Sequence, residues 1–377
     1  MYLSTPPIRH TIKSFLLLVV LTNLFPNITL AAYRFGDFTA HPPIHELTGK
    51  NAVEKGFAPD TVKAAYRLPS RGGKGTIAII TAYDAPHMRD DLALFSKKFS
   101  LPECTEKNGC FEKHAMNAST APDPGWRMET ALDVEWAHAI APDAKILLVE
   151  AKTPSGANLL KAVDYARARS DVVAISMSWG GAEFSDEVTL DEHFTSDHGV
   201  TFFAASGDNG TGASWPAASP NVISVGGTHF TLDKNGNVKS ETGWSGSGGG
   251  ISAYEPEPVY QSDYNIPKAK GMRAIPDVAY NADPHSGYLI YVSDDGQGGG
   301  WHVVGGTSAG SPQWAAIRTV SSPFTNEQLY KDKASDTHNS YFRDIVSGKN
   351  GACVYFCSAH KHYDYVTGLG SPQTSMF

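Results

Sequence analysis

The run Thr76-Ile-Ala-Ile-Ile-Thr-Ala82 decides the fold, because it is mostly apolar, rich in β-branched residues and as long as a typical strand. A strand that is apolar on both faces is typical of a parallel sheet with helices on both sides. Four further runs of this kind follow along the chain, at 145–150, 172–178, 200–206 and 221–225. The sequence therefore predicts a mainly parallel sheet.

Segments with helical periodicity lie between several of these strands, at 90–99, 126–140, 158–168 and 186–198. This alternation predicts an α/β fold, a doubly wound, mainly parallel sheet with helices on both faces. From Gly226 onward the chain is richer in glycine, serine and turns, and no repeat or linker divides it. We expect one domain over 72–377, preceded by an N-terminal extension at 32–71.

Composition and charge narrow the class of protein. The chain has 377 residues, of which 41% are hydrophobic and 19% charged, so it can bury the core of one large domain. The formal net charge is −8 and there is no dense tract of lysine and arginine. These features argue against a nucleic-acid partner, and we expect a monomer.

The N-terminus has the layout of a secretory signal peptide. Arg9 and Lys13 precede an apolar run at 15–25, and the small residues Ala31 and Ala32 follow it. A membrane anchor is the alternative, but polar residues and a proline interrupt the run before the roughly 20 residues that a spanning helix needs. We expect a signal peptide over 1–31 and a secreted protein, extracellular or periplasmic, with no membrane association after its removal.

The four cysteines form two close pairs. Cys104 and Cys110 are six residues apart, and Cys353 and Cys357 are four apart. In an oxidising compartment this spacing favours two short-loop disulfides. A four-thiolate zinc site is the alternative, although neither spacing is that of a CxxC knuckle.

A pair of carboxylates lies in the predicted helix 126–140, which Asp123 is placed to cap. Glu129 and Asp133 are four residues apart and fall within an apolar stripe on one face, the stripe of Met128, Leu132, Trp136 and Ile140. The opposite face, with Arg127 and His138, is where an exposed pair would lie.

Burial of this pair would give it a chemical use. Two buried carboxyls can share one proton, and the ionised member can act as a general base at a pH where histidine is protonated. An exposed acidic helix face, or a buried pair neutralised by arginine or lysine, is the alternative. The placement of Glu129 and Asp133 on the apolar stripe favours the functional interpretation.

A candidate nucleophile stands in Gly305-Gly-Thr-Ser-Ala-Gly-Ser-Pro312, between the strand-like run 301–304 and a predicted helix at 313–319. Glycines allow a tight turn there, and Ser308 would lie near a helix N-terminus, which favours negative charge. The alternative is that Thr307, Ser308 or Ser311 only caps the helix.

Asp208 follows the predicted strand 200–206 in the turn Gly207-Asp-Asn-Gly210. Ligands of α/β sheets bind beyond the carboxyl ends of the strands, so this turn is well placed. A protonated Asp208 could donate a hydrogen bond to a tetrahedral oxyanion, which again requires acidic conditions. An ordinary turn is the alternative.

Together these motifs resemble the sedolisin family of serine-carboxyl peptidases, from about Pro59 to Pro372. The matching stretches are GTIAIITAYD (75–84), ETALD (129–133), SMSWGG (176–181), SGDNG (206–210), GGTSA (305–309) and TGLGSP (367–372). The GTSA serine is also a feature of subtilisins, but the His-Gly-Thr base motif of ordinary subtilisins is absent.

The resemblance implies a subtilisin-like fold and endopeptidase activity on proteins or peptides at acidic pH. It implies Ser308 as nucleophile, Glu129 as general base and acid, Asp133 as its support and Asp208 in the oxyanion hole. The residues that match the family's strand for substrate backbone are Ser176, Ser178, Trp179 and Gly180.

The resemblance also implies one calcium ion close to the C-terminus. Its ligands would include Asp344, the carbonyl of Ile345 and Asp364, oxygen atoms that suit a hard cation. Two further carbonyls come from positions where the family has glycine and this chain has His360 and His362.

A long N-terminal propeptide is common in the family, and only about forty residues separate the predicted signal peptide from the first matching strand. We therefore expect no long propeptide within this sequence. Two other functions stay open at this point: a secreted binding protein with an inactive site, and a histidine-dependent subtilisin active near neutral pH.

Overall fold

The computed structural model describes residues 1, 34–49, 52–117, 122–293, 299–335 and 340–373. The described residues from Arg34 onward form one compact unit. The predicted signal peptide, 1–31, lies outside the described residues except for Met1. No helix among the described residues is both long enough and apolar enough to cross a membrane.

The central sheet is built around β2, the run Thr76–Ala82, whose seven residues are all buried. The strand order is β10-β9-β7-β5-β2-β4-β3, with β13 beside β9, and every pair is parallel except β10 with β9. The strands are β3 (Phe111–Ala115), β4 (Lys145–Ala151), β5 (Val172–Met177), β7 (Thr201–Ala205), β9 (Val222–Leu232), β10 (Val238–Gly243) and β13 (Val278–Asn281). The predicted parallel sheet is confirmed.

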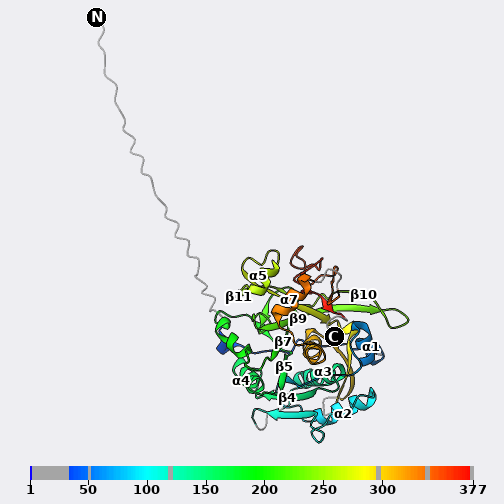
Figure 1. Cartoon of the computed structure of the whole chain (residues 1–377). Coiled ribbons are helices and arrows are strands. Elements are labelled where there is room, and N and C mark those ends of the chain that lie inside the picture. Colours follow the sequence, from blue (N-terminus) through cyan, green and yellow to red (C-terminus); the bar gives the residue numbers. More distant parts are fainter. Residues whose placement is uncertain (2–33, 50–51, 118–121, 294–298, 336–339, 374–377) are drawn as a thin grey trace. The chain divides into compact units, whose positions relative to one another are not determined.

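Helices cover both faces of this sheet, as predicted. Figure 1 shows β4, β5, β7 and β9 in that order, with α4 on one side and α3 on the other. Alternate β2 residues enter different cores: Ile77 and Ile79 pack in one cluster, and Ala78 and Ile80 in the other. The helices packed on the sheet are α3 (Pro124–Ile140), α4 (Gly156–Arg167) and α6 (Gly310–Val320), and α2 (Met88–Lys98) packs on α3.

Helix α3 is buried around almost its whole circumference. Trp136 and Ile140 are inaccessible to solvent, as predicted, but Arg127 and His138 on the opposite face are also buried. The expectation of a solvent-facing side was therefore wrong, because the other face is packed against neighbouring elements such as α1 and α2. The side chains of α3 are therefore surrounded by protein on nearly all sides.

Smaller elements complete the fold. The remaining helices are α1 (Pro59–Tyr66), α5 (Val259–Tyr264) and α7 (Asn326–Ser335), with 3-10 turns η1 (Phe35–Asp37), η2 (Val53–Lys55), η3 (Glu187–Phe194), η4 (Pro284–Ser286) and η5 (Thr307–Ala309). The remaining strands are β1 (His45–Glu46), β6 (Gly181–Ala182), β8 (Ser214–Trp215), β11 (Gly250–Pro256), β12 (Met272–Ile275), β14 (Tyr288–Val292), β15 (Gly300–Gly305), β16 (Phe342–Arg343) and β17 (Ser371–Pro372).

Segment 186–198, predicted as a helix, forms only the 3-10 turn η3. Local hydrogen bonds compete there with a regular α-helix. The Thr189 hydroxyl donates to the Asp186 carbonyl, and the Thr195 hydroxyl donates to the Glu192 carbonyl. The prediction missed this competition because it used only the spacing of apolar residues.

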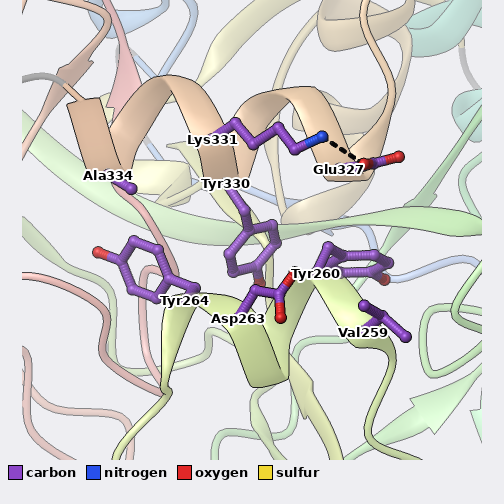
Figure 2. A pocket seen from close by; sticks show the side chains of 8 residues that line it. All are labelled: Val259, Tyr260, Asp263, Tyr264, Glu327, Tyr330, Lys331 and Ala334. Carbon is purple, nitrogen blue, oxygen red and sulfur yellow. Dashed lines mark hydrogen bonds and ion pairs between the residues drawn. The ribbon is translucent and has the colours of Figure 1, made fainter.

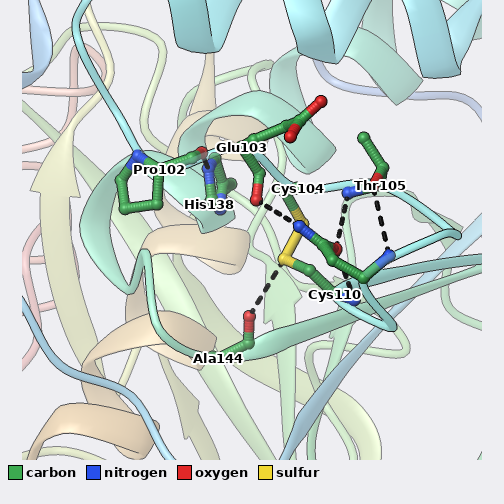
Figure 3. The surroundings of a disulfide bond; sticks show 8 residues. Pro102, Glu103, Cys104, Thr105, Cys110, His138 and Ala144 are labelled. Atoms are coloured by element: carbon green, nitrogen blue, oxygen red, sulfur yellow. Dashed lines mark hydrogen bonds between the residues drawn. A yellow bond between two sulfur atoms is a disulfide. The ribbon is translucent and has the colours of Figure 1, made fainter.

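Both predicted disulfides are present, Cys104–Cys110 and Cys353–Cys357. The four-thiolate zinc alternative was therefore wrong. Figure 3 shows the first bridge beside His138, whose Nε2 lies 2.9 Å from the Pro102 carbonyl. Burial lowers the pKa of His138, which favours the neutral form of the imidazole beside the disulfide.

Candidate active site

Glu129 and Asp133 lie one turn apart on α3, and neither side chain is accessible to solvent. The helix begins with Pro124, and the Asp123 side chain accepts a hydrogen bond from the Trp126 amide at 3.0 Å. The predicted cap and the predicted burial of both acids are confirmed. The sequence thus places two carboxyls in the interior where apolar side chains would pack better.

These two acids have no cation to neutralise them: within the described part of the chain, neither forms an ion pair, and both Glu129 oxygens lack a hydrogen-bond partner. Burial, and then the neighbouring Asp133, raise the pKa of Glu129 well above its usual range. Burial also raises the pKa of Asp133, while a hydrogen bond from Ser178 opposes that rise. The pair is therefore built to retain a proton.

Ser308 lies in η5, directly before α6, and is completely buried. Gly306 has φ +124°, a conformation that side-chain-bearing residues rarely adopt, so the turn requires glycine. Contact with the Ser308 hydroxyl lowers the pKa of Glu129, although the two groups do not meet the geometry of a hydrogen bond. The candidate nucleophile and the candidate base are therefore neighbours.

Asp208 joins the end of β7 to the serine turn. Its Oδ1 accepts hydrogen bonds from the Thr307 amide at 2.8 Å and the Thr307 hydroxyl at 2.7 Å. Its Oδ2 lies 3.1 Å from Nε2 of His45. Burial raises the pKa of Asp208, and the contact with His45 partly opposes this. A carboxyl able to hold a proton therefore stands next to the residue that precedes Ser308.

The four residues that match the family's substrate strand are not equally available to a ligand. Ser176, Ser178 and Trp179 are completely buried, and each side chain bonds inside the protein: Ser176 to Ser311, Ser178 to Asp133, and the Trp179 indole to the Ile80 carbonyl. Only Gly180 is half-buried and lines a cleft. The side chains of the three buried residues therefore support the site from within.

An open cleft runs past Gly180 and Asp208. Its lining comes from the segments 41–45, 180–182 and 206–214, together with Gly248. The segment 41–45 belongs to the N-terminal extension, which sequence reasoning did not place near the site. Extended, proline-containing and without periodicity, it carries no sequence signal for that position, although Phe38 and Ala40 beside it are buried.

The C-terminal region brings the predicted calcium ligands together in part. Oδ1 of Asp344 is buried and has no hydrogen-bond partner among the described residues, so this oxygen is available to a cation. Both Asp364 oxygens already accept hydrogen bonds, and the amides of His360 and His362 donate to Asp364 and Asp344. His362 has φ +69°, a conformation that the family's glycine would adopt more easily.

A second groove lies between α5 and α7 (Figure 2). Val259, Tyr260 and Tyr264 face Tyr330 and an ion pair of Lys331 with Glu327. None of the predicted site residues lines this groove. The candidate chemistry therefore belongs to the cleft past Gly180 and Asp208.

Comparison with known proteins agrees with this geometry. The sequence profile of the Subtilase family matches residues 118–331. Kumamolisin from Bacillus sp. (strain MN-32) is 31% identical over 87% of this chain and 64% of its own length. Sedolisin from Pseudomonas sp. (strain 101) is 29% identical over 84% of this chain and 60% of its own length.

A solved structure shares the fold. Pseudomonas sedolisin, a serine-carboxyl proteinase complexed with two molecules of pseudo-iodotyrostatin, superposes with a TM-score of 0.73 at 28% identity, covering 84% of this chain and 95% of its own. This chain spans less than two thirds of the length of the two curated relatives, kumamolisin and sedolisin. With its subtilisin-like fold and its buried acid pair beside Ser308, the chain belongs to the sedolisin family.

Proposed function

We propose that this chain is a serine-carboxyl endopeptidase that hydrolyses peptide bonds of proteins or peptides at acidic pH. The observation that carries the proposal is the burial of Glu129 and Asp133, without a cation, next to the Ser308 hydroxyl. Burying two carboxyls in this way works against folding, so a chemical role accounts for it better than a structural one.

The reaction would use these residues in sequence. The ionised Glu129 takes the proton of Ser308, whose Oγ attacks the carbonyl carbon and forms a tetrahedral intermediate. The Ser308 amide and a protonated Asp208 stabilise the oxyanion. Glu129 then gives its proton to the leaving amine, and water releases the acyl group from Ser308 by the reverse steps. Asp133 shares the proton of Glu129 throughout.

The acid range of the reaction follows from Asp208. A carboxyl can donate a hydrogen bond only while it is protonated. Because burial raises the pKa of Asp208, it keeps its proton to a higher pH than an exposed aspartate and loses it as the pH rises through that value. Activity would fall on the alkaline side for this reason, and on the acid side when the Glu129–Asp133 pair becomes fully protonated.

Digestion of an unfolded protein across pH tests this function. We expect cleavage between about pH 3 and 6, where carboxyl groups titrate in proteins. An optimum near neutral pH would point instead to a histidine base, and no cleavage at any pH to a binding protein on this fold. Ser308 Oγ has no histidine partner among the described residues, which speaks against the neutral alternative.

We also propose that the protein is secreted. Two disulfides, one of them between the exposed Cys353 and the buried Cys357, fit an oxidising compartment. The basic, apolar and small-residue order of 1–31 fits the same route. Edman sequencing of the exported protein tests the cleavage, since a mature N-terminus near residue 32 is expected and an intact Met1 would contradict it.

One calcium ion near Asp344 is a further part of the proposal. The free Oδ1 of Asp344 and the carbonyls of Ile345, His360 and His362 are its candidate ligands, while Asp364 holds the loop by its hydrogen bonds. Calcium would bring these oxygens together and stabilise the C-terminal loop.

Chelation tests this calcium site without reference to activity. We expect EGTA to lower the melting temperature by several degrees and added Ca²⁺ to restore it, because binding to the folded state alone stabilises that state. Asp344→Asn should remove the response to EGTA. A melting temperature that is indifferent to EGTA and Ca²⁺ in the unmodified chain would contradict the site.

A further inference from the structure

We infer that Ser178 is a positioning residue for the acid pair, an inference that rests on the proposed function. Its hydroxyl lies 2.7 Å from Oδ1 of Asp133 and 3.2 Å from the carbonyl oxygen of Ser308, and it is completely buried. One side chain therefore contacts both the acid pair and the backbone of the nucleophile.

The direction of this hydrogen bond gives Ser178 its effect. A hydroxyl that donates to Oδ1 of Asp133 stabilises the ionised carboxylate and leaves Oδ2 as the oxygen that shares a proton with Glu129. The first proton then leaves the pair at a lower pH than it would without the donor. Ser178 would therefore let the base work at a lower pH than it could without this hydrogen bond.

Ser176 provides a matched control on the same strand. It is also completely buried, but its hydroxyl lies 2.9 Å from the Ser311 hydroxyl. It does not bond to the acid pair. Ser176→Ala and Ser178→Ala therefore remove the same atom from similar surroundings. Only the second change removes a donor to Asp133.

The experiment compares pH–rate profiles of Ser178→Ala, Ser178→Thr and Ser176→Ala. We expect Ser178→Ala to move the acid limb of kcat upward by roughly one pH unit and to lower kcat about tenfold or more. Ser178→Thr should restore the acid limb to its original pH, and Ser176→Ala, whatever it does to the rate, should leave the acid limb at that pH. If the acid limbs of kcat for Ser178→Ala and Ser176→Ala lie at the same pH, the inference is overturned.

Melting temperatures across the same pH range need no activity and form the second readout. We expect Ser178→Ala to lose more stability at pH 7 than at pH 3, because the missing hydrogen bond serves the ionised pair. A loss independent of pH would show a structural role only. A wild-type chain that hydrolyses nothing would refute the proposed function, while this pH dependence would still report on the contact with Asp133.

Discussion

Ser308→Ala is expected to lower kcat for digestion of an unfolded protein by about 10⁴-fold or more at every pH. The hydroxyl is the attacking group, and neither the acid pair nor Asp208 can replace it. Rates across pH 3 to 8, measured at saturating substrate, check this. A residual rate within tenfold of the unmodified chain would show that another group performs the reaction.

Ser311→Ala is the matched control for this change. Ser311 is also buried, lies on the same turn of the chain and bonds to Ser176 and to the Phe203 carbonyl. We expect it to keep kcat within about tenfold, because its hydroxyl contacts no acid. Equal losses in both serine variants would indicate damage to the turn and not to the nucleophile.

Glu129→Gln is expected to lower kcat by about 10³-fold, because glutamine fills the same space but cannot accept the serine proton. Loss of a structural residue would destabilise the fold, whereas we expect Glu129→Gln not to destabilise it at pH 7. The raised pKa of Glu129 means that the carboxyl contributes stability below its unfolded pKa and loses this contribution as the pH rises through the folded value. Glutamine should therefore melt at the same temperature or higher at pH 7.

Glu135→Gln separates this effect from the general burial of carboxyls on α3. Glu135 is equally inaccessible, but its Oε2 accepts a hydrogen bond from the Tyr291 amide at 3.0 Å. We expect that variant to keep its kcat within about tenfold. Measurements of kcat and of the melting temperature for Glu129→Gln and Glu135→Gln check both expectations. A Glu129→Gln chain that keeps full activity would sink the assignment of the base.

Much of the fold could be predicted because its decisive signals are local. The run at 76–82 has apolar residues on both faces and all seven of its residues are buried, which is typical of a parallel sheet covered on both sides. The acid pair was predictable for the same reason, since Glu129 and Asp133 interrupt an apolar stripe. A carboxyl at a position where packing favours an apolar side chain is a signal that can be read from a single sequence, without relatives.

Contacts between distant segments could not be predicted in this way. Nothing in the composition of residues 39–46 indicates that His45 meets Asp208, 163 positions away. The partner of Ser178 was missed because resemblance placed the whole segment 176–180 against substrate, whereas the Ser178 side chain is buried and donates to Asp133. The backbone of Gly180 and the side chain of Ser178 therefore serve different parts of the site.

Covalent labelling of Ser308 by a fluorophosphonate, followed by peptide mass spectrometry, tests the central claim most directly. The labelling rate reports how well the acids activate this hydroxyl, independently of substrate preference. We predict that the unmodified chain is labelled on Ser308 at acidic pH and that Glu129→Gln and Asp133→Asn are labelled at least about a hundredfold more slowly. Labelling of Ser308 at the same rate in all three chains would contradict the account.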